Sequence, residues 1–131
     1  MKLVLDASAA IEVLLGRGQA ARLAAILGEA DVVLAPDLFV SEVVNTVWKY
    51  HHFERLNLDA CDRAIESALA LVDNLVPSKD VYGEAFLLAR TAHRPAYDMF
   101  YLALARREDA VFLTLDKTLR KEAEHQGVRV A

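Results

Sequence analysis

Apolar residues recur along this chain in two alternating patterns, which are short continuous runs and stripes with a helical period. The continuous runs predict strands at residues 2–5, 32–35, 75–76, 111–115 and 128–130. The stripes predict helices at residues 9–15, 19–27, 38–53, 57–72, 80–92, 97–107 and 116–126. Because strands alternate with helices and are apolar throughout, a parallel sheet covered on both faces is expected. The sequence thus predicts one α/β domain over residues 1–131, with four to five short strands between layers of helices.

Composition narrows the class of protein that this domain can be. Of the 131 residues, 55% are hydrophobic and 26% are charged, and the net charge of −4 is modest, which excludes a generally disordered chain. Lysine and arginine number 15 against 19 aspartate and glutamate residues. Any contact with nucleic acid therefore needs a local basic patch or a bound cation.

The single cysteine and the lengths of the apolar runs indicate the compartment. Cys61 alone excludes an intrachain disulfide, fits a reducing environment and is expected to be a small buried packing residue. No apolar run reaches the ~18 residues of a membrane span, and the apolar start of the chain is too short for a signal peptide. We therefore expect a soluble cytoplasmic protein without membrane contact.

Four acidic residues are predicted to lie near one edge of the sheet. Asp6 directly follows the first predicted strand, and Asp116 directly follows the fourth. Asp98 falls in the first turn of the sixth predicted helix, and Glu42 in the first turns of the third. Because ligands of open parallel sheets bind outside the carboxyl ends of the strands, this edge is the candidate site.

Each of these acids also has a purely structural interpretation. Asp6, Asp98 and Asp116 suit the cap or first turn of a helix, and Glu42 is suited to the border of an apolar stripe. Gathered within ~4–6 Å, however, four carboxylates would repel one another and raise each other's pKa values. A hard divalent cation relieves that repulsion, and oxygen ligands select Mg²⁺ or Mn²⁺ over Zn²⁺. The histidines show no zinc-binding spacing.

Four blocks of this sequence resemble the PIN-domain ribonucleases, and in size and spacing the VapC-type toxins of toxin–antitoxin pairs. The blocks are residues 6–8 (DAS), 42–45 (EVVN), 97–105 (YDMFYLALA) and 113–119 (LTLDKTL). The resemblance extends over essentially the whole chain, residues 2–130, with Ala7 as the main departure, where a threonine or another small residue is common. The resemblance implies a single PIN-like domain that acts as a Mg²⁺- or Mn²⁺-dependent endoribonuclease.

The resemblance also implies roles for particular residues. Asp6, Glu42, Asp98 and Asp116 match the four acids of the family's metal site and are the expected catalytic and metal-binding residues. We expect Asp6, Asp98 and Asp116 to hold the metal, and Glu42 to bind a second ion or orient the attacking water. The polar positions expected to support these carboxylates are Ser8, Asn45 and Thr114.

An RNA substrate needs a cationic path to this acidic centre. The candidates near the same edge are Arg17, Arg22, Arg94, Lys117, Arg120 and Lys121, each of which is otherwise an ordinary solvated charge. By resemblance, a homodimer and a cognate antitoxin protein are the expected partners. If any of Leu38, Phe39, Trp48, Phe53 and Phe86 form an exposed patch, that patch would mark a protein interface.

Three other functions are weighed against this one. A non-enzymatic acidic α/β module that binds a protein partner would use the carboxylates only as caps and would hold no cation. A phosphoacceptor receiver domain is disfavoured because Asp6 stands alone and the segment 76–78 lacks an acceptor aspartate. A haloacid-dehalogenase-like phosphatase would need a second aspartate at position 8, which is a serine.

Overall fold

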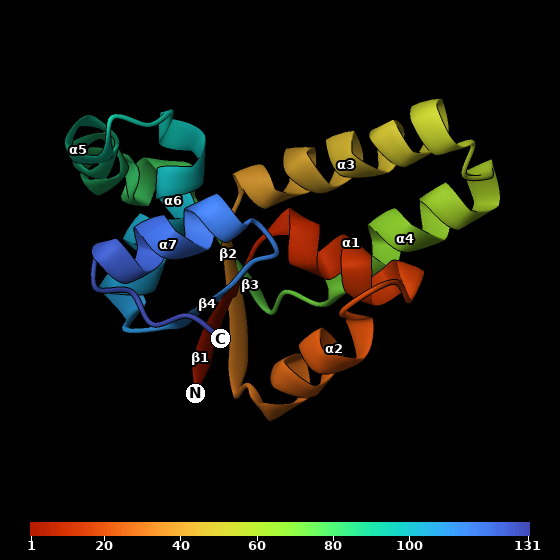
Figure 1. Cartoon of the computed structure of the whole chain (residues 1–131), viewed down its shortest axis with the longest axis horizontal. Helices are drawn as coiled ribbons and strands as arrows, with labels where there is room; N and C mark the ends of the chain where they lie inside the picture. Colours follow the sequence, from red (N-terminus) through yellow and green to blue (C-terminus); the bar gives the residue numbers. More distant parts are fainter.

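A four-stranded parallel sheet lies at the centre of the molecule (Figure 1). The computed structural model describes residues 1–131, and the strands are β1 (Lys2–Leu5), β2 (Val32–Pro36), β3 (Asn74–Val76) and β4 (Val111–Leu113). Their order across the sheet is β3-β2-β1-β4. The chain therefore runs outward from β1 through β2 to β3, and then crosses to the other side of β1 to form β4. The strand order reverses between β1 and β4, which is where open α/β sheets bind ligands.

Seven α-helices cover the two faces of the sheet (Figure 1). Helices α1 (Ala7–Leu15), α2 (Ala20–Glu29), α3 (Leu38–Glu54) and α4 (Leu58–Ala70) lie on one side of the strands. Helices α5 (Tyr82–Ala92), α6 (Ala96–Glu108) and α7 (Lys117–His125) lie on the other. The predicted α/β class, the parallel sheet and the covering of both faces are therefore confirmed.

The register between the two strands at the switch point brings distant residues together. Leu5 of β1 lies beside Leu113 of β4, so the residues that follow, Asp6 and Thr114, leave the sheet at the same edge. The main-chain N–H of Asp6 donates a hydrogen bond to the Leu113 carbonyl at 3.2 Å. The pairing of β1 and β4 thus fixes the relative positions of the two loops after these strands.

The ends of most predicted elements shift by one or two residues, and three differences bear on the sheet and its connections. The strand expected at 111–115 stops at Leu113, because Thr114 and the Leu115 N–H turn toward side chains of the first loop. The strand expected at 128–130 is reduced to one bridge between Val130 and Phe112. The helix expected at 80–92 begins only at Tyr82, after a short 3₁₀ turn (Ser78–Asp80).

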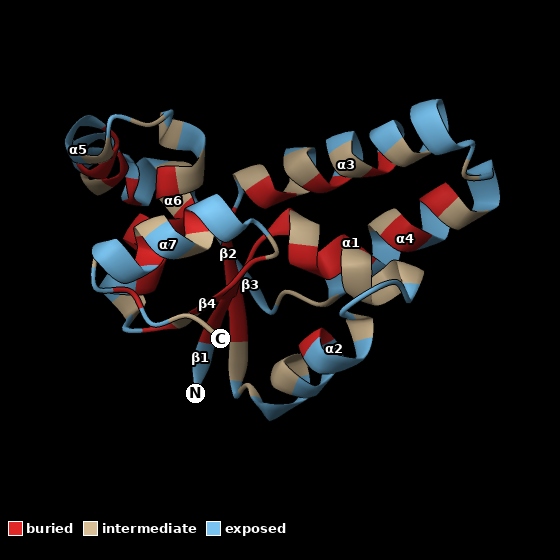
Figure 2. Ribbon diagram, in the orientation of Figure 1, coloured by how far each residue is buried: buried red, intermediate tan, exposed pale blue.

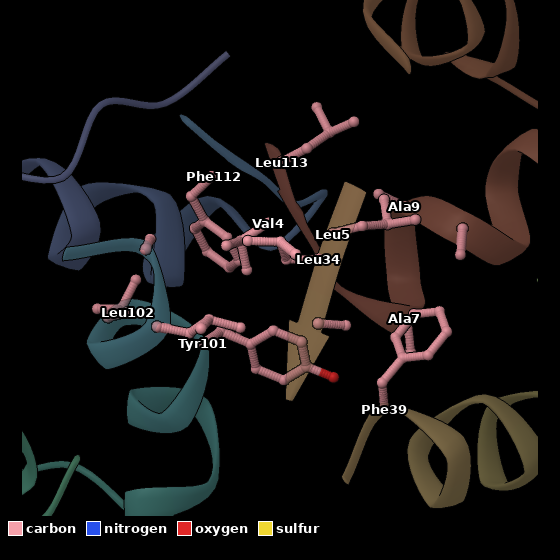
Figure 3. Packing of buried hydrophobic residues seen from close by; sticks show 14 of the residues in the cluster. Val4, Leu5, Ala7, Ala9, Leu34, Phe39, Tyr101, Leu102, Phe112 and Leu113 are labelled. Atoms are coloured by element: carbon pink, nitrogen blue, oxygen red, sulfur yellow. The ribbon is translucent and has the colours of Figure 1, made fainter. Parts of the chain in front are cut away.

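The core lies between the sheet and its two helical layers (Figures 2 and 3). Tyr101 of α6 packs beside Phe112 of β4, with ring centroids 6.1 Å apart. Cys61 is buried in α4, as expected for a packing residue. None of the helices combines the length and the apolar content that a membrane span requires.

The large apolar residues considered for the core separate into buried and exposed sets. Phe39 is fully buried, whereas Trp48, Phe53 and Phe86 are exposed by 51%, 71% and 60%. Trp48 and Phe53 lie on the outer half of α3, which extends beyond the sheet together with the start of α4 (Figure 2). Exposed aromatic side chains of this kind form a candidate surface for contacts with another molecule.

Candidate functional site

Asp6 is the most deeply buried acid of the candidate site. It follows β1 directly and caps α1, because its Oδ1 accepts a hydrogen bond from the Ala9 N–H at 3.0 Å. The same oxygen accepts a bond from the Ser8 hydroxyl at 2.7 Å, and Oδ2 accepts one from the Thr114 hydroxyl. Every one of these donors lies in the loops or helix starts that follow β1 and β4. Asp6 is therefore both a helix cap and a fixed carboxylate at the switch point.

A hydrogen-bonded network ties the two loops together around Asp6. The Leu115 N–H donates to the Ser8 oxygen at 3.2 Å, and the Asp116 N–H donates to the Thr114 oxygen at 3.1 Å. Ser8 and Thr114 thus each donate to Asp6 while accepting a bond from the loop after β4. This arrangement supports the role predicted for these two hydroxyls, because it fixes the orientation of the carboxylate.

Asp116 begins α7 at the other side of the switch point. Its Oδ1 accepts bonds from the N–H groups of Thr118 at 2.9 Å and Leu119 at 3.0 Å. Its second oxygen, Oδ2, accepts no hydrogen bond from the protein. The cap therefore uses one carboxylate oxygen and leaves the other available to a ligand.

Asp98 and Glu42 approach the site from α6 and α3. Asp98 lies in the first turn of α6 without capping it, and its carboxylate is 3.8 Å from the Arg94 guanidinium. Glu42 lies in the second turn of α3, and its Oε1 is buried without a hydrogen-bond partner. The Tyr101 hydroxyl is likewise buried without a hydrogen bond of regular geometry, and it lies close enough to Glu42 to lower the pKa of that carboxyl group. An unpaired buried carboxylate oxygen is costly, so it marks a position where a ligand is expected.

The four carboxyl groups interact electrostatically, as the causes of their pKa shifts show. Burial, with a smaller contribution from Asp98, raises the pKa of Asp6 to about 6 despite three hydrogen bonds that lower it. Burial, followed by the charges of Asp98 and Asp6, raises the pKa of Glu42 to about 7. Burial and the charge of Asp116 raise the pKa of Asp98, although Arg94 opposes the shift. The acids predicted to share one edge thus form one coupled group.

The donor set fits a hard divalent cation, although the side chains are not yet in coordination geometry. No group of three or more Asp, Glu, His or Cys side chains is arranged to hold one ion as it stands. The donors are all carboxylate oxygens, Glu42 Oε1 has no partner, and burial and mutual repulsion disfavour the charged forms. A bound Mg²⁺ or Mn²⁺ would remove that repulsion. Asp6, Glu42, Asp98 and Asp116 are the residues that would hold it.

Of two further residues near the acids, Asn45 was predicted from the sequence to support the site and Tyr101 was not. Asn45, expected to support the site, is exposed on α3 three residues after Glu42 and makes no side-chain hydrogen bond. Tyr101 was not identified from the sequence, because an aromatic residue on an apolar helix stripe normally belongs to the core. Its spacing of three residues from Asp98 on one helix was the available signal, since such residues share a face.

The six candidate RNA-binding residues fall into different surroundings. Arg17 pairs with Glu54 at 3.0 Å, and Arg94 faces Asp98, so their charges are partly neutralised. Lys121 is exposed on α7. The other three line one cleft of about 230 Å³ beside Thr114, and they are Arg22, Lys117 and Arg120.

The chain is similar to a known protein family and to a curated protein of that kind. The PIN domain family matches residues 3–124 of the chain. A curated relative, ribonuclease VapC3 of Pyrobaculum aerophilum, is 29% identical over 93% of this chain and 95% of its own length.

Solved structures agree on the fold. A Pyrobaculum aerophilum protein, PAE2754, has a TM-score of 0.74 at 20% identity, covering 99% of this chain and 89% of its own. VapBC2 from Rickettsia felis, bound to a DNA fragment from their promoter, has a TM-score of 0.67 at 12% identity, with 100% and 98% coverage. The family match spans nearly the whole chain and includes all four acids, and this protein therefore belongs to the PIN domain family.

Proposed function

We propose that this protein is a Mg²⁺- or Mn²⁺-dependent endoribonuclease and the toxin of a toxin–antitoxin pair. The observation that carries the proposal is the coupled group of four carboxyl groups at the β1–β4 switch point, with Glu42 Oε1 buried and unpaired. Membership of the PIN domain family supports it. The name of the curated relative, ribonuclease VapC3, supports the same activity and substrate class.

The reaction is the hydrolysis of an RNA phosphodiester bond. The oxygen of water bonds to phosphorus, the bond from phosphorus to the 3′ oxygen breaks, and that oxygen takes up a proton. The products carry 5′-phosphate and 3′-hydroxyl ends. A divalent cation, when bound, supplies the positive charge that stabilises the phosphate oxygens during this step.

The side chains of this protein supply the oxygen ligands for the cation and the carboxyl group that acts on the water. Asp6 is held by Ser8 and Thr114 in one orientation, so it presents a fixed oxygen ligand. Asp98 and Asp116 complete the set of oxygen ligands from the starts of α6 and α7. Glu42, with a pKa raised to about 7, either binds a second ion or orients the water and accepts its proton.

The decisive experiment is a calorimetric Mn²⁺ titration of the metal-stripped protein, beside the variants Asp98→Asn and Asp62→Asn. Asp62 is exposed on α4, so Asp62→Asn is the matched control for loss of one carboxylate. We expect binding in the parent and in Asp62→Asn, and strong weakening in Asp98→Asn. Equal titrations for all three proteins, or no binding up to millimolar Mn²⁺, would favour a non-enzymatic protein-interaction module instead.

Cleavage of RNA then tests the activity itself. Total cellular RNA is digested with the parent and both variants in Mg²⁺ or Mn²⁺, and the new ends are mapped. Cleavage that persists in Asp62→Asn and disappears in Asp98→Asn belongs to this protein. Cleavage that persists equally in Asp98→Asn comes from another nuclease.

The proposal includes a homodimer, a cognate antitoxin protein and a location in the cytoplasm. The exposed side chains of Trp48, Phe53 and Leu58 supply apolar area for protein contacts. Trp48 also stacks on His52, with ring centroids 4.9 Å apart. Light scattering on the purified protein measures the dimer, and co-expression with the protein encoded beside it tests for the antitoxin.

A further inference from the structure

We propose that the cleft between α2 and α7 binds the phosphodiester backbone of the RNA next to the scissile bond. The cleft has a volume of about 230 Å³ and is lined by Gln19, Arg22, Thr114, Leu115, Lys117 and Arg120. This inference rests on the proposed function, because it assigns part of the substrate to a place beside the carboxylates.

Three cations from two distant segments converge on this cleft. Arg22 belongs to α2, whereas Lys117 and Arg120 belong to α7, which begins after the loop that contains Thr114 and Leu115 (Figure 1). No acidic residue lines the cleft, although the protein as a whole carries a net charge of −4. Arg120 also pairs with Glu124 at 3.9 Å, so Arg22 and Lys117 supply most of the free positive charge of the cleft. The cleft is therefore a local positive site on an acidic protein, and such a site attracts an anion.

The cationic side chains are held in place while retaining donors for a ligand. The Arg22 Nε–H donates to Gln19 Oε1 at 3.0 Å, and an Arg120 N–H donates to the main-chain oxygen of Ala131. A guanidinium has five N–H groups, so each arginine keeps others for a ligand. Lys117 forms no ion pair and lies in the first turn of α7, where the helix dipole adds positive potential.

The cleft is directly connected to the carboxylate site. Thr114 lines it and also donates a hydrogen bond to Asp6, the buried acid of the site. Lys117 follows Asp116, the acid that caps α7. A nucleic-acid strand whose reacting phosphate lies at the carboxylates therefore has a neighbouring nucleotide at the cleft.

The chemistry of the lining favours phosphate over a base or an apolar peptide. Arginine and lysine are the usual partners of backbone phosphates, and Gln19 and Thr114 add neutral polar groups. No aromatic side chain lines the cleft, so it offers no surface on which a base could stack. Recognition here is expected to be independent of sequence and sensitive to salt.

The test measures RNA binding without cleavage. A fluorescently labelled single-stranded RNA of ten nucleotides is titrated in EDTA, and anisotropy is followed at several KCl concentrations. The test variant is Arg22→Ala/Lys117→Ala. The control is Lys49→Ala/Arg63→Ala, which removes two exposed cations from α3 and α4 outside the cleft. The variant Arg22→Lys/Lys117→Arg keeps both charges, so it shows whether weaker RNA binding comes from the lost charges or from changed packing.

We expect the cleft variant to bind RNA at least tenfold more weakly at low salt. Its slope of log affinity against log salt should fall by about 1.4, since each lost phosphate contact on a single strand removes about 0.7. The control and the charge-keeping variant should retain the slope of the parent. Equal losses in the cleft variant and the control, an unchanged slope, or no RNA binding by the parent would overturn the inference.

The Mn²⁺ titration distinguishes a failure of the cleft assignment from a failure of the proposed function. The cleft variant is expected to bind Mn²⁺ like the parent, because neither substituted residue supplies a carboxylate. If the parent binds Mn²⁺ and cleaves RNA but the cleft variant binds RNA normally, only the cleft assignment fails. If the parent binds no Mn²⁺ while the cleft variant still loses RNA affinity, the nuclease proposal fails and the cleft assignment stands.

Discussion

The Thr114 hydroxyl donates a hydrogen bond to Asp6 Oδ2 across 108 positions of the chain. This bond joins the loops after the first and the last strand of the sheet, and both atoms are buried. It favours the ionised form of Asp6, whose pKa burial raises. The bond therefore orients a ligand oxygen and keeps it available to a cation.

Replacing Thr114 tests that relationship. Thr114→Val keeps the shape of the side chain and removes the donor, so Asp6 loses both its orientation and part of the stabilisation of its charge. We expect Mn²⁺ affinity and RNA cleavage to fall by about 10- to 100-fold. Thr114→Ser, which keeps the hydroxyl, should stay close to the parent. Calorimetry and a cleavage assay would contradict the role if Thr114→Val matched Thr114→Ser.

The metal-free protein is expected to lose stability as the pH rises. Asp6 titrates at 3.8 when unfolded and at about 6 when folded, and Glu42 at 4.5 and about 7. Between those values the folded state binds more protons than the unfolded state, so stability falls with pH. The loss begins near pH 4, is complete above about pH 7, and is on the order of 3 kcal/mol for the buried Asp6.

Glu42→Gln isolates one part of this effect. Glutamine resembles the protonated acid, so the variant and the parent should melt at the same temperature near pH 4. At pH 8 the variant should melt several degrees higher, because the parent then carries a half-buried charge beside Asp98 and Asp6. Glu66→Gln, at an exposed position of α4, is the matched control and should show no such gap. A constant difference at every pH would contradict the shift.

Divalent metal should stabilise the folded protein, and more so at higher pH. An ion that binds only the folded state adds about 2.7 kcal/mol at a concentration 100 times its dissociation constant. At pH 8 the carboxylates are charged and bind, whereas near pH 5 protons compete for Asp6 and Glu42. Thermal melts with Mn²⁺, Mg²⁺ or EDTA at both pH values measure this. A stabilisation that did not depend on pH would place the ion elsewhere.

Tyr101→Phe tests the buried hydroxyl beneath the site. That hydroxyl makes no hydrogen bond of regular geometry, although it lies beside the Glu42 carboxyl group, and burial of a poorly bonded group costs about 1–3 kcal/mol. Its removal should leave the fold intact and raise the free energy of unfolding by about 1 kcal/mol in the metal-free protein. Urea denaturation measures the change. A loss of stability would show that the hydroxyl is bonded in solution, with Glu42 Oε1 as the neighbouring unpaired acceptor.

The positions of the four acids could be predicted because each depends on local rules. Asp6 and Asp116 follow apolar runs and begin helices, and parallel strands end at the same edge. The structural interpretation, a helix cap, is confirmed for Asp6 and Asp116, and it is compatible with the functional one. A cap uses the backbone of one helix turn and leaves other carboxylate lone pairs for a ligand.

Other features depend on pairing between distant segments and could not be derived. The bond from Thr114 to Asp6 requires the register of β1 against β4, which no local pattern specifies. The presence of Arg22 and Lys117 at one cleft depends on where α2 and the start of α7 lie in the fold. The exposure of Trp48 and Phe53 follows from the extension of α3 past the sheet, which depends on packing and not on apolar content.

The pairing of β1 with β4 also has a consequence for synthesis on the ribosome. Chains emerge from their N-terminus, so Asp6 is made 108 positions before its partner Thr114, and the fourth acid, Asp116, follows Thr114. A nascent or prematurely released chain that stops before residue 111 lacks β4, so β1, which pairs with β2 on its other side, is left as an unprotected edge strand. Assembly of the acidic centre therefore waits until β4 and the loop after it have been made.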